Sequence, residues 1–165
     1  MAAAASIPSA DRIGRFGAYY VRTLLGQAGV PHTETMSGED HNAVDITVTL
    51  PTGACFVQVK TGTIDTNKNG SIAVPVNDAW KAKWAANRLP VYLVYVHLEK
   101  QLPVDWVSHE ALRAVVHATV LWARVNEVTG QSVRLSGDNR LTADTFGLWA
   151  DEFDDRPAWG EVAGA

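Results

Sequence analysis

The sequence predicts an α/β protein in which helices flank a mixed central β-sheet. Residues 11–27 place apolar side chains at helical spacing, whereas residues 43–60 alternate between polar and apolar side chains around a Pro-Thr-Gly turn. Residues 90–97 form a nearly continuous apolar run, which is typical of a strand buried on both faces. Helical and strand patterns are therefore interleaved, as in layered α/β architectures.

The first predicted elements are a helix over residues 11–27 and a short strand over residues 30–36. Gly29 ends the helix, because glycine adopts the left-handed conformation found after many helices. The apolar stripe of this helix consists of residues 13, 16, 20, 21, 24, 25 and 28.

The second half of the chain supplies further strands and helices. After a polar loop at 65–70, residues 71–76 are predicted to form a strand and residues 78–87 a helix. Trp80 and Trp84 lie one turn apart on that helix, where they either anchor it to the core or stack on bases. Beyond the 90–97 strand, we expect a strand at 103–108, a short helix at 109–116, two strands within 119–135 around Thr129-Gly130, and a last helix at 142–153.

The hairpin of residues 43–60 brings polar side chains to one face. If Thr52-Gly53 is a two-residue loop, Asp45 lies opposite Lys60 and Thr47 lies opposite Gln58, while the other face is uniformly apolar. A loop with an odd number of residues would separate Asp45 from Lys60 unless a bulge restored the phase. The amphipathic pattern favours convergence of the carboxylate, the amide and the ammonium.

Such a cluster suits metal-dependent phosphodiester chemistry. Mg²⁺ or Mn²⁺ takes oxygen ligands, which Asp45, the amide of Gln58 and the carbonyl of Val59 could supply. Lys60 would then orient or deprotonate the attacking water, or neutralise charge in the transition state. The alternative is an ordinary cross-strand Asp–Lys pair on an exposed sheet face.

The order of these motifs resembles the PD-(D/E)XK nuclease superfamily, within it the small prokaryotic DUF4365-like domains and the Mrr-like branch that has Gln before x-Lys. The matching segments lie between residues 14 and 110 and are Gly14-Arg-Phe-Gly17, Val44-Asp-Ile46, Val57-Gln-Val-Lys-Thr61, Trp80, Pro90-Val-Tyr-Leu-Val-Tyr-Val96 and Val104-Asp-Trp-Val107. The resemblance implies a restriction-endonuclease-like fold and a role in phage defence or DNA processing.

One position departs from that pattern. Such families carry a Glu in the first helix immediately after the second Gly, where it completes the metal site, and here Ala18 occupies that position. The nearest compensating groups precede the Asp45 strand, namely Glu39, Asp40 and His41; His41 is either a plain loop residue or a proton shuttle.

Composition indicates one domain over residues 11–165, preceded by a flexible start at residues 1–10 and ending in an acidic segment. Residues 138–165 hold 2 basic and 7 acidic side chains, whereas residues 1–137 are nearly neutral. The sequence shows neither a membrane span nor a signal peptide, so we expect a cytoplasmic protein. The single cysteine, Cys55, lies on the apolar face of the hairpin and is expected in the core.

Two classes of function fit these observations. The first is a Mg²⁺- or Mn²⁺-dependent nuclease acting on DNA or RNA, with Lys68, Lys81, Lys83 and Arg88 as substrate-binding residues or, alternatively, as a solvated helix face. The second is a non-catalytic module of the same fold that docks a protein or nucleic acid. The net charge of −4 predicts weak binding of nucleic acid by the protein alone. The oligomeric state is left open, a homo-oligomer included.

Overall fold

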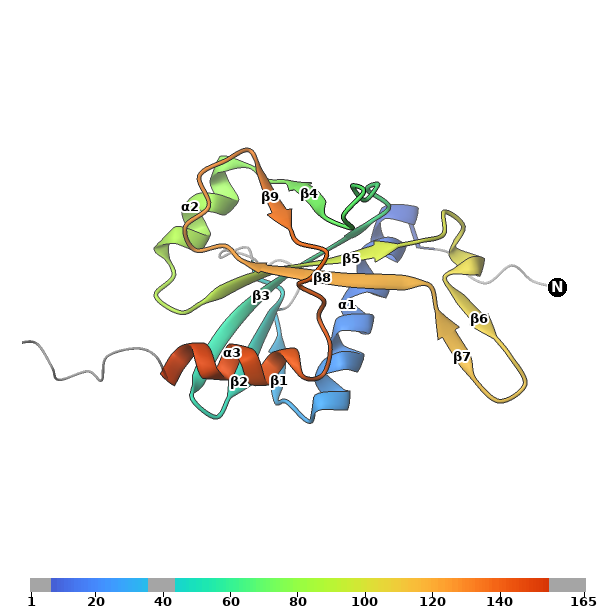
Figure 1. Ribbon diagram of the computed structural model, residues 1–165, viewed down its shortest axis with the longest axis horizontal. Helices are drawn as coiled ribbons and strands as arrows, with labels where there is room; N and C mark the ends of the chain where they lie inside the picture. Colours follow the sequence, from blue (N-terminus) through green and yellow to red (C-terminus); the bar gives the residue numbers. More distant parts are fainter. Residues whose placement is uncertain (1–6, 36–43, 155–165) are drawn as a thin grey trace, which may run out of the picture.

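A computed structural model describes residues 7–35 and 44–154 (Figure 1). A five-stranded sheet has the strand order β1-β2-β3-β5-β8. Its strands are β1 (His32–Glu34), β2 (Ile46–Leu50), β3 (Gly53–Gly62), β5 (Val91–Leu98) and β8 (Ala118–Arg124). β3 and β5 run parallel, whereas the other neighbours are antiparallel, so the central sheet is mixed as predicted.

Two helices, α1 (Ser9–Ala28) and α3 (Thr145–Asp154), cover one face of this sheet (Figure 1). The predicted first helix is confirmed, and it ends at Gly29, whose φ of 67° is left-handed. The helix approaches β3 closely, because Gly17 leaves no room for a Cβ against Thr61. Trp149 of α3 is fully buried, and its ring stacks on Tyr92 of β5 with 3.9 Å between centroids.

The opposite face carries the two-stranded sheet formed by β4 (Ile72–Pro75) and β9 (Ser132–Leu135), together with α2 (Asp78–Ala86). The amide of Asn77 caps α2 by accepting from the Trp80 N–H. Trp84 is fully buried, as expected for a helix anchor. Asn126 joins the layers, since it accepts from the Val91 N–H and donates to the Leu89 carbonyl.

Helix α3, which belongs to the acidic C-terminal segment, lies on the α1 face. Glu152 accepts a hydrogen bond from the Tyr92 hydroxyl at 2.6 Å, and burial, followed by the neighbouring Glu152, raises the pKa of that hydroxyl. The side chain of Phe153 and all of Trp159 lie outside the described residues. Helix α3, within this segment, is therefore on the face opposite α2.

Two predictions for residues 103–116 were wrong. In place of one strand at 103–108, the structure has a 3₁₀ turn, η1 (Pro103–Asp105), followed by β6 (Val107–His109). In place of a helix at 109–116, β7 (Ala114–Val116) pairs antiparallel with β6. Eight residues are too few to form a stable helix without a buried face, and Leu112 at the tip is fully exposed, so the β-branched Val115 and Val116 pair instead.

Cys55 is fully buried, as predicted, and burial raises the pKa of its thiol to about 12. Within residues 7–35 and 44–154, no helix has the length and apolarity needed to cross a membrane.

Candidate functional site

The candidate site lies where β2 and β3 separate. The last register pair joins Ile46 to Val57, yet β3 continues to Gly62, so its final residues extend past the start of β2. The backbone bends at Asp45, whose N–H donates to the Val57 carbonyl, one residue out of the regular register. This local irregularity directs the Asp45 side chain toward the free edge of β3.

The Asp45 carboxylate binds two donors through the same oxygen. Oδ2 accepts from Gln58 Nε2 at 2.5 Å and from the Val59 backbone N–H at 2.6 Å. Because N–H and C=O of one strand residue point to the same side, the Val59 carbonyl also faces this edge. The structure thus brings together three of the predicted site residues.

The register differs from the predicted one by two residues. Asp45 lies across from Gln58 rather than Lys60, since the two-residue turn is Pro51-Thr52 and Leu50 pairs with Gly53. Proline favours the second position of a turn because its φ is fixed, and glycine favours the fourth, so Leu50 to Gly53 form the turn. A shift of two residues preserves the alternation of faces, which is why Gln58 still meets Asp45.

The Gln58 side chain has the features of a metal ligand. Its side chain is only 3% exposed, and Oε1 has no hydrogen-bond partner among the described residues. A buried amide oxygen left without a partner costs free energy, commonly about 1–3 kcal/mol. A bound cation beside Asp45 would satisfy it, so the oxygen donors present fit a hard divalent metal.

Lys60 lies on the same side of β3 as Gln58, two residues along the strand. Its ammonium lies over the ring of Trp80, 3.8 Å from the centroid, so a side chain of α2 holds the lysine in place. The sequence did not predict this contact. Its cation–π geometry gives Trp80 a role besides anchoring α2 to the core. The predicted approach of the Lys60 ammonium to the Asp45 carboxylate stays a prediction.

A pocket of about 410 Å³ opens beside Asp45 on the α1 side. Its lining includes Ala18, Glu34, Asp45 and Val59. Ala18 therefore faces the site, as the resemblance implied, but brings no carboxylate. Glu34, at the end of β1, was not anticipated; its carboxylate pairs with Arg22 at 3.2 Å. Its position at the end of the predicted strand 30–36 was the available signal.

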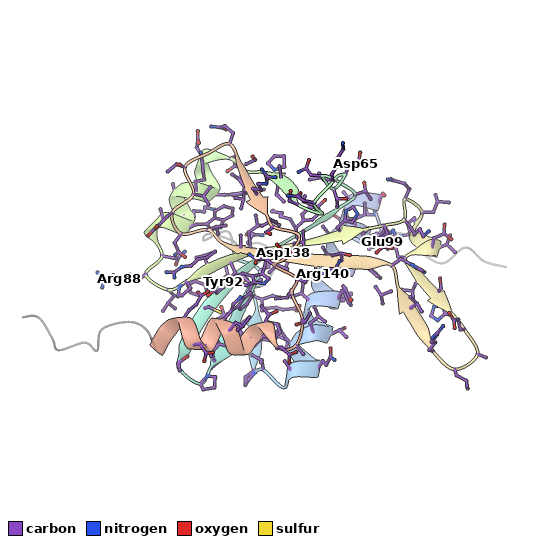
Figure 2. All side chains as sticks on the ribbon, in the orientation of Figure 1. Asp65, Arg88, Tyr92, Glu99, Asp138 and Arg140 are labelled. Carbon is purple, nitrogen blue, oxygen red and sulfur yellow. The ribbon has the colours of Figure 1, made fainter. Side chains whose placement is uncertain are left out.

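The remaining predicted residues do not gather at one place. Lys81 is mostly buried: its ammonium lies 2.8 Å from Asp78 and donates to the carbonyls of Thr129 and Gly130. Arg88 lies at the left edge and Asp65 toward the upper right of the molecule in Figure 2, and Lys68 belongs to the loop that contains Asp65, between β3 and β4. Lys83 lies on α2 in the last turn. Glu39, Asp40 and His41 lie outside the described residues.

Comparison with known proteins identifies the fold. No protein-family model matches the chain, and no curated protein matches it by sequence. Among solved structures, the chain is similar to Hjc of Archaeoglobus fulgidus, a Holliday junction resolvase, with a TM-score of 0.50 and 13% identity. The match covers 81% of this chain and 95% of the resolvase. The fold is therefore restriction-endonuclease-like, as predicted.

Proposed function

We propose that this protein is a Mg²⁺- or Mn²⁺-dependent phosphodiesterase that cleaves nucleic acid. The observation that carries the proposal is the convergence of Gln58 and Val59 on one oxygen of Asp45, while the buried Gln58 Oε1 has no hydrogen-bond partner within the described part of the chain. The resolvase whose fold the chain shares supports the same class of chemistry. The resemblance to DUF4365-like and Mrr-like domains, with a role in DNA processing or defence, belongs to this proposal.

Each residue has a defined part in the proposed reaction. Asp45, the amide oxygen of Gln58 and the Val59 carbonyl would hold the cation, which, when bound, polarises the phosphate and acidifies a water. The Gln58 and Val59 donors keep the Asp45 carboxylate in one orientation before substrate arrives. Lys60 supplies positive charge for the phosphorane-like transition state, and Trp80 holds its ammonium in place.

A cleavage assay tests the proposal. We would incubate the protein with single-stranded and duplex DNA and with RNA, in Mg²⁺ or Mn²⁺, and compare Asp45→Asn, Lys60→Ala and the exposed control Lys100→Ala. Asp45→Asn should fold, because its amide oxygen still accepts from Val59 and Gln58 can rotate to present Oε1. Both site variants should lose about 10²-fold or more of the rate, while Lys100→Ala should match wild type.

Metal binding gives a second readout that does not depend on activity. With a single carboxylate bonded into the site, we expect weak binding of one Mn²⁺ in calorimetry without nucleic acid. Ala18→Glu adds a carboxylate to the pocket and should tighten Mn²⁺ binding about tenfold, whereas Gln27→Glu on an exposed part of α1 should not. Tight binding at two sites in wild type would contradict the single-carboxylate description and point to Glu34, Glu39 or Asp40.

The second candidate is a binding module that no longer cleaves, and Ala18 favours it because the pocket lacks the helical carboxylate. It predicts no cleavage with any substrate or metal, no Mn²⁺ binding by wild type, and nucleic acid or protein binding unaffected by Lys60→Ala. That combination of results would reject the enzyme.

A further inference from the structure

A second, larger pocket lies along α1 and shares two lining residues with the pocket beside Asp45. The second pocket has a volume of about 580 Å³ and lies between the beginning of α1 and the turn before β6. Arg15 and Tyr19 line both pockets. We use the name α1 groove for the two pockets together with the surface of Arg15 and Tyr19 that they share, between the candidate site and Val104.

Basic and aromatic side chains of α1 follow one stripe along the helix, and three of them, Arg12, Arg15 and Tyr19, line the groove. Arg12, Arg15, Tyr19 and Arg22 are spaced by three, four and three residues, which places them on one side of a helix. Arg12 and Arg15 are exposed, and neither has an ion-pair partner among the described residues. Arg22 lies 6.0 Å from the Tyr19 ring centroid, so basic and aromatic groups alternate along the stripe.

The floor of the groove is apolar and consists of packed aromatic rings. Phe16 packs on Trp106 with 5.0 Å between ring centroids, and the Trp106 indole N–H donates to the Lys100 carbonyl. The upper parts remain open to solvent: Tyr19 is 57% exposed and Val104 is 79% exposed. An exposed ring above a fixed apolar floor offers a place for a flat, partly apolar group.

We propose that the α1 groove binds a single strand of nucleic acid and leads it to the Asp45 site. Arg12 and Arg15 would contact phosphates, while an unpaired base would stack on Tyr19 or enter the apolar pocket. Guanidinium groups interleaved with exposed aromatic rings form the usual surface for single strands, because every base has a face that stacks. This inference rests on the proposed function and adds the class of substrate.

Charge and shape distinguish this occupant from the others. A duplex keeps its bases stacked inside, so it could use the arginines but would leave the apolar pocket and Tyr19 without a partner. A second copy of the chain, related by two-fold symmetry, would bring its own Arg12 and Arg15 against or near this stripe, which is unfavourable for like charges. A polyanion with exposed bases matches both features.

Fluorescence anisotropy with a labelled thymidine oligonucleotide of about 12 nucleotides tests the inference. The titrations would use the full chain in EDTA, at about 50 and 200 mM salt, so that no cleavage occurs. Arg12→Ala combined with Arg15→Ala should weaken binding about tenfold or more and lower the salt slope by about 1.4. Tyr19→Ala should weaken binding about 5- to 150-fold without changing that slope.

Matched controls separate the groove from general effects. Arg113→Ala removes an exposed arginine at the tip of the β6–β7 hairpin and should leave affinity unchanged. A duplex of the same length should bind about tenfold more weakly than the single strand. Equal affinity for both forms, together with no effect of Tyr19→Ala, would overturn the inference. A dimer seen by sedimentation that Tyr19→Ala dissociates would instead identify a second copy as the occupant.

The outcome is independent of whether the protein cleaves. If Lys60→Ala and wild type are both inactive, yet the Arg12, Arg15 and Tyr19 variants weaken single-strand binding, the proposed enzymatic function is rejected and the inference about the groove is supported. If wild type cleaves nucleic acid but the same variants bind the single strand as wild type does, the inference about the groove is rejected and the proposed enzymatic function is supported.

Discussion

The close contact between Gly17 of α1 and Thr61 of β3 allows a sharp test of how the helix is placed beside the candidate site. A Cβ at position 17 would lie 1.8 Å from the Thr61 Oγ1 and 2.8 Å from its Cβ. Rotation of Thr61 can move Oγ1, but its Cβ is fixed to the strand. To restore an ordinary contact of 3.4 Å, the helix and strand must separate by about 0.6 Å.

The expected cost follows from two opposing effects. Overpacking of this kind costs about 3 kcal/mol, the upper end of the usual range, because backbone has to move. Replacing glycine by alanine inside a helix returns about 1 kcal/mol. Gly17→Ala should therefore lower the free energy of unfolding by about 2 kcal/mol, which for a chain of this length lowers Tm by about 4–8 °C.

Gly26→Ala is the matched control, because within residues 7–35 and 44–154 no neighbouring atom lies within 4 Å of the Cβ that it would add to the same helix. It should stabilise the protein by about 0.5–1 kcal/mol. Urea denaturation of both variants measures the difference. Adding Thr61→Ala to Gly17→Ala should recover about 1 kcal/mol, since it removes Oγ1 and Cγ2 but leaves Cβ. If Gly17→Ala proves as stable as Gly26→Ala, the described packing of α1 on β3 is wrong.

Two further predictions concern stability. The pKa of Cys55 is raised from about 9 in the unfolded chain to about 12 by burial, so its contribution is complete below pH 9 and is lost as pH rises toward 12. Urea titrations at pH 7 and 10.5 should show that wild type loses up to about 2 kcal/mol more than Cys55→Ala, and an equal loss in both would refute this. Asn126→Ala should cost about 2–4 kcal/mol, because the Val91 N–H and the Leu89 carbonyl both lose their partner. Asn126→Asp keeps only the acceptor, so its free energy of unfolding should lie between those of wild type and Asn126→Ala. A cost below about 0.5 kcal/mol for Asn126→Ala would show that the amide does not join the layers.

The elements with strong periodicity could be predicted from the sequence. The first helix, the hairpin and the strand at 90–97 were all confirmed, because each has a long apolar pattern that decides its structure locally. The helix predicted at 109–116 was wrong because the structure of this segment is not decided locally. Its local preference is helical, but pairing with β6 decides its structure. The partners of β4 and β9 were likewise beyond prediction, since they lie about 60 residues apart in the chain.

The candidate site was partly predictable because alternation of faces survives a shift of two residues. Gln58 and Asp45 were expected on one face and do meet, although the turn and therefore the register were misassigned. What could not be predicted comes from contacts between distant segments. Trp80 reaches Lys60 from α2, and Glu34 reaches the pocket from β1.

The end of the β2–β3 ladder explains why site and groove lie together. Regular pairing stops at Ile46, so the edge of β3 beyond Val57 must satisfy its N–H groups in another way, and Asp45 does so at Val59. The site thus lies at the edge of β3, and α1 packs on the face of the same strand, where Gly17 permits the close approach and Ala18 lines the pocket beside Asp45. Because one helix both lines the pocket and carries the arginine stripe, a displacement of α1 by Gly17→Ala should disturb metal binding and single-strand binding together. If the two properties changed independently in that variant, the pocket and the groove would not form one continuous site.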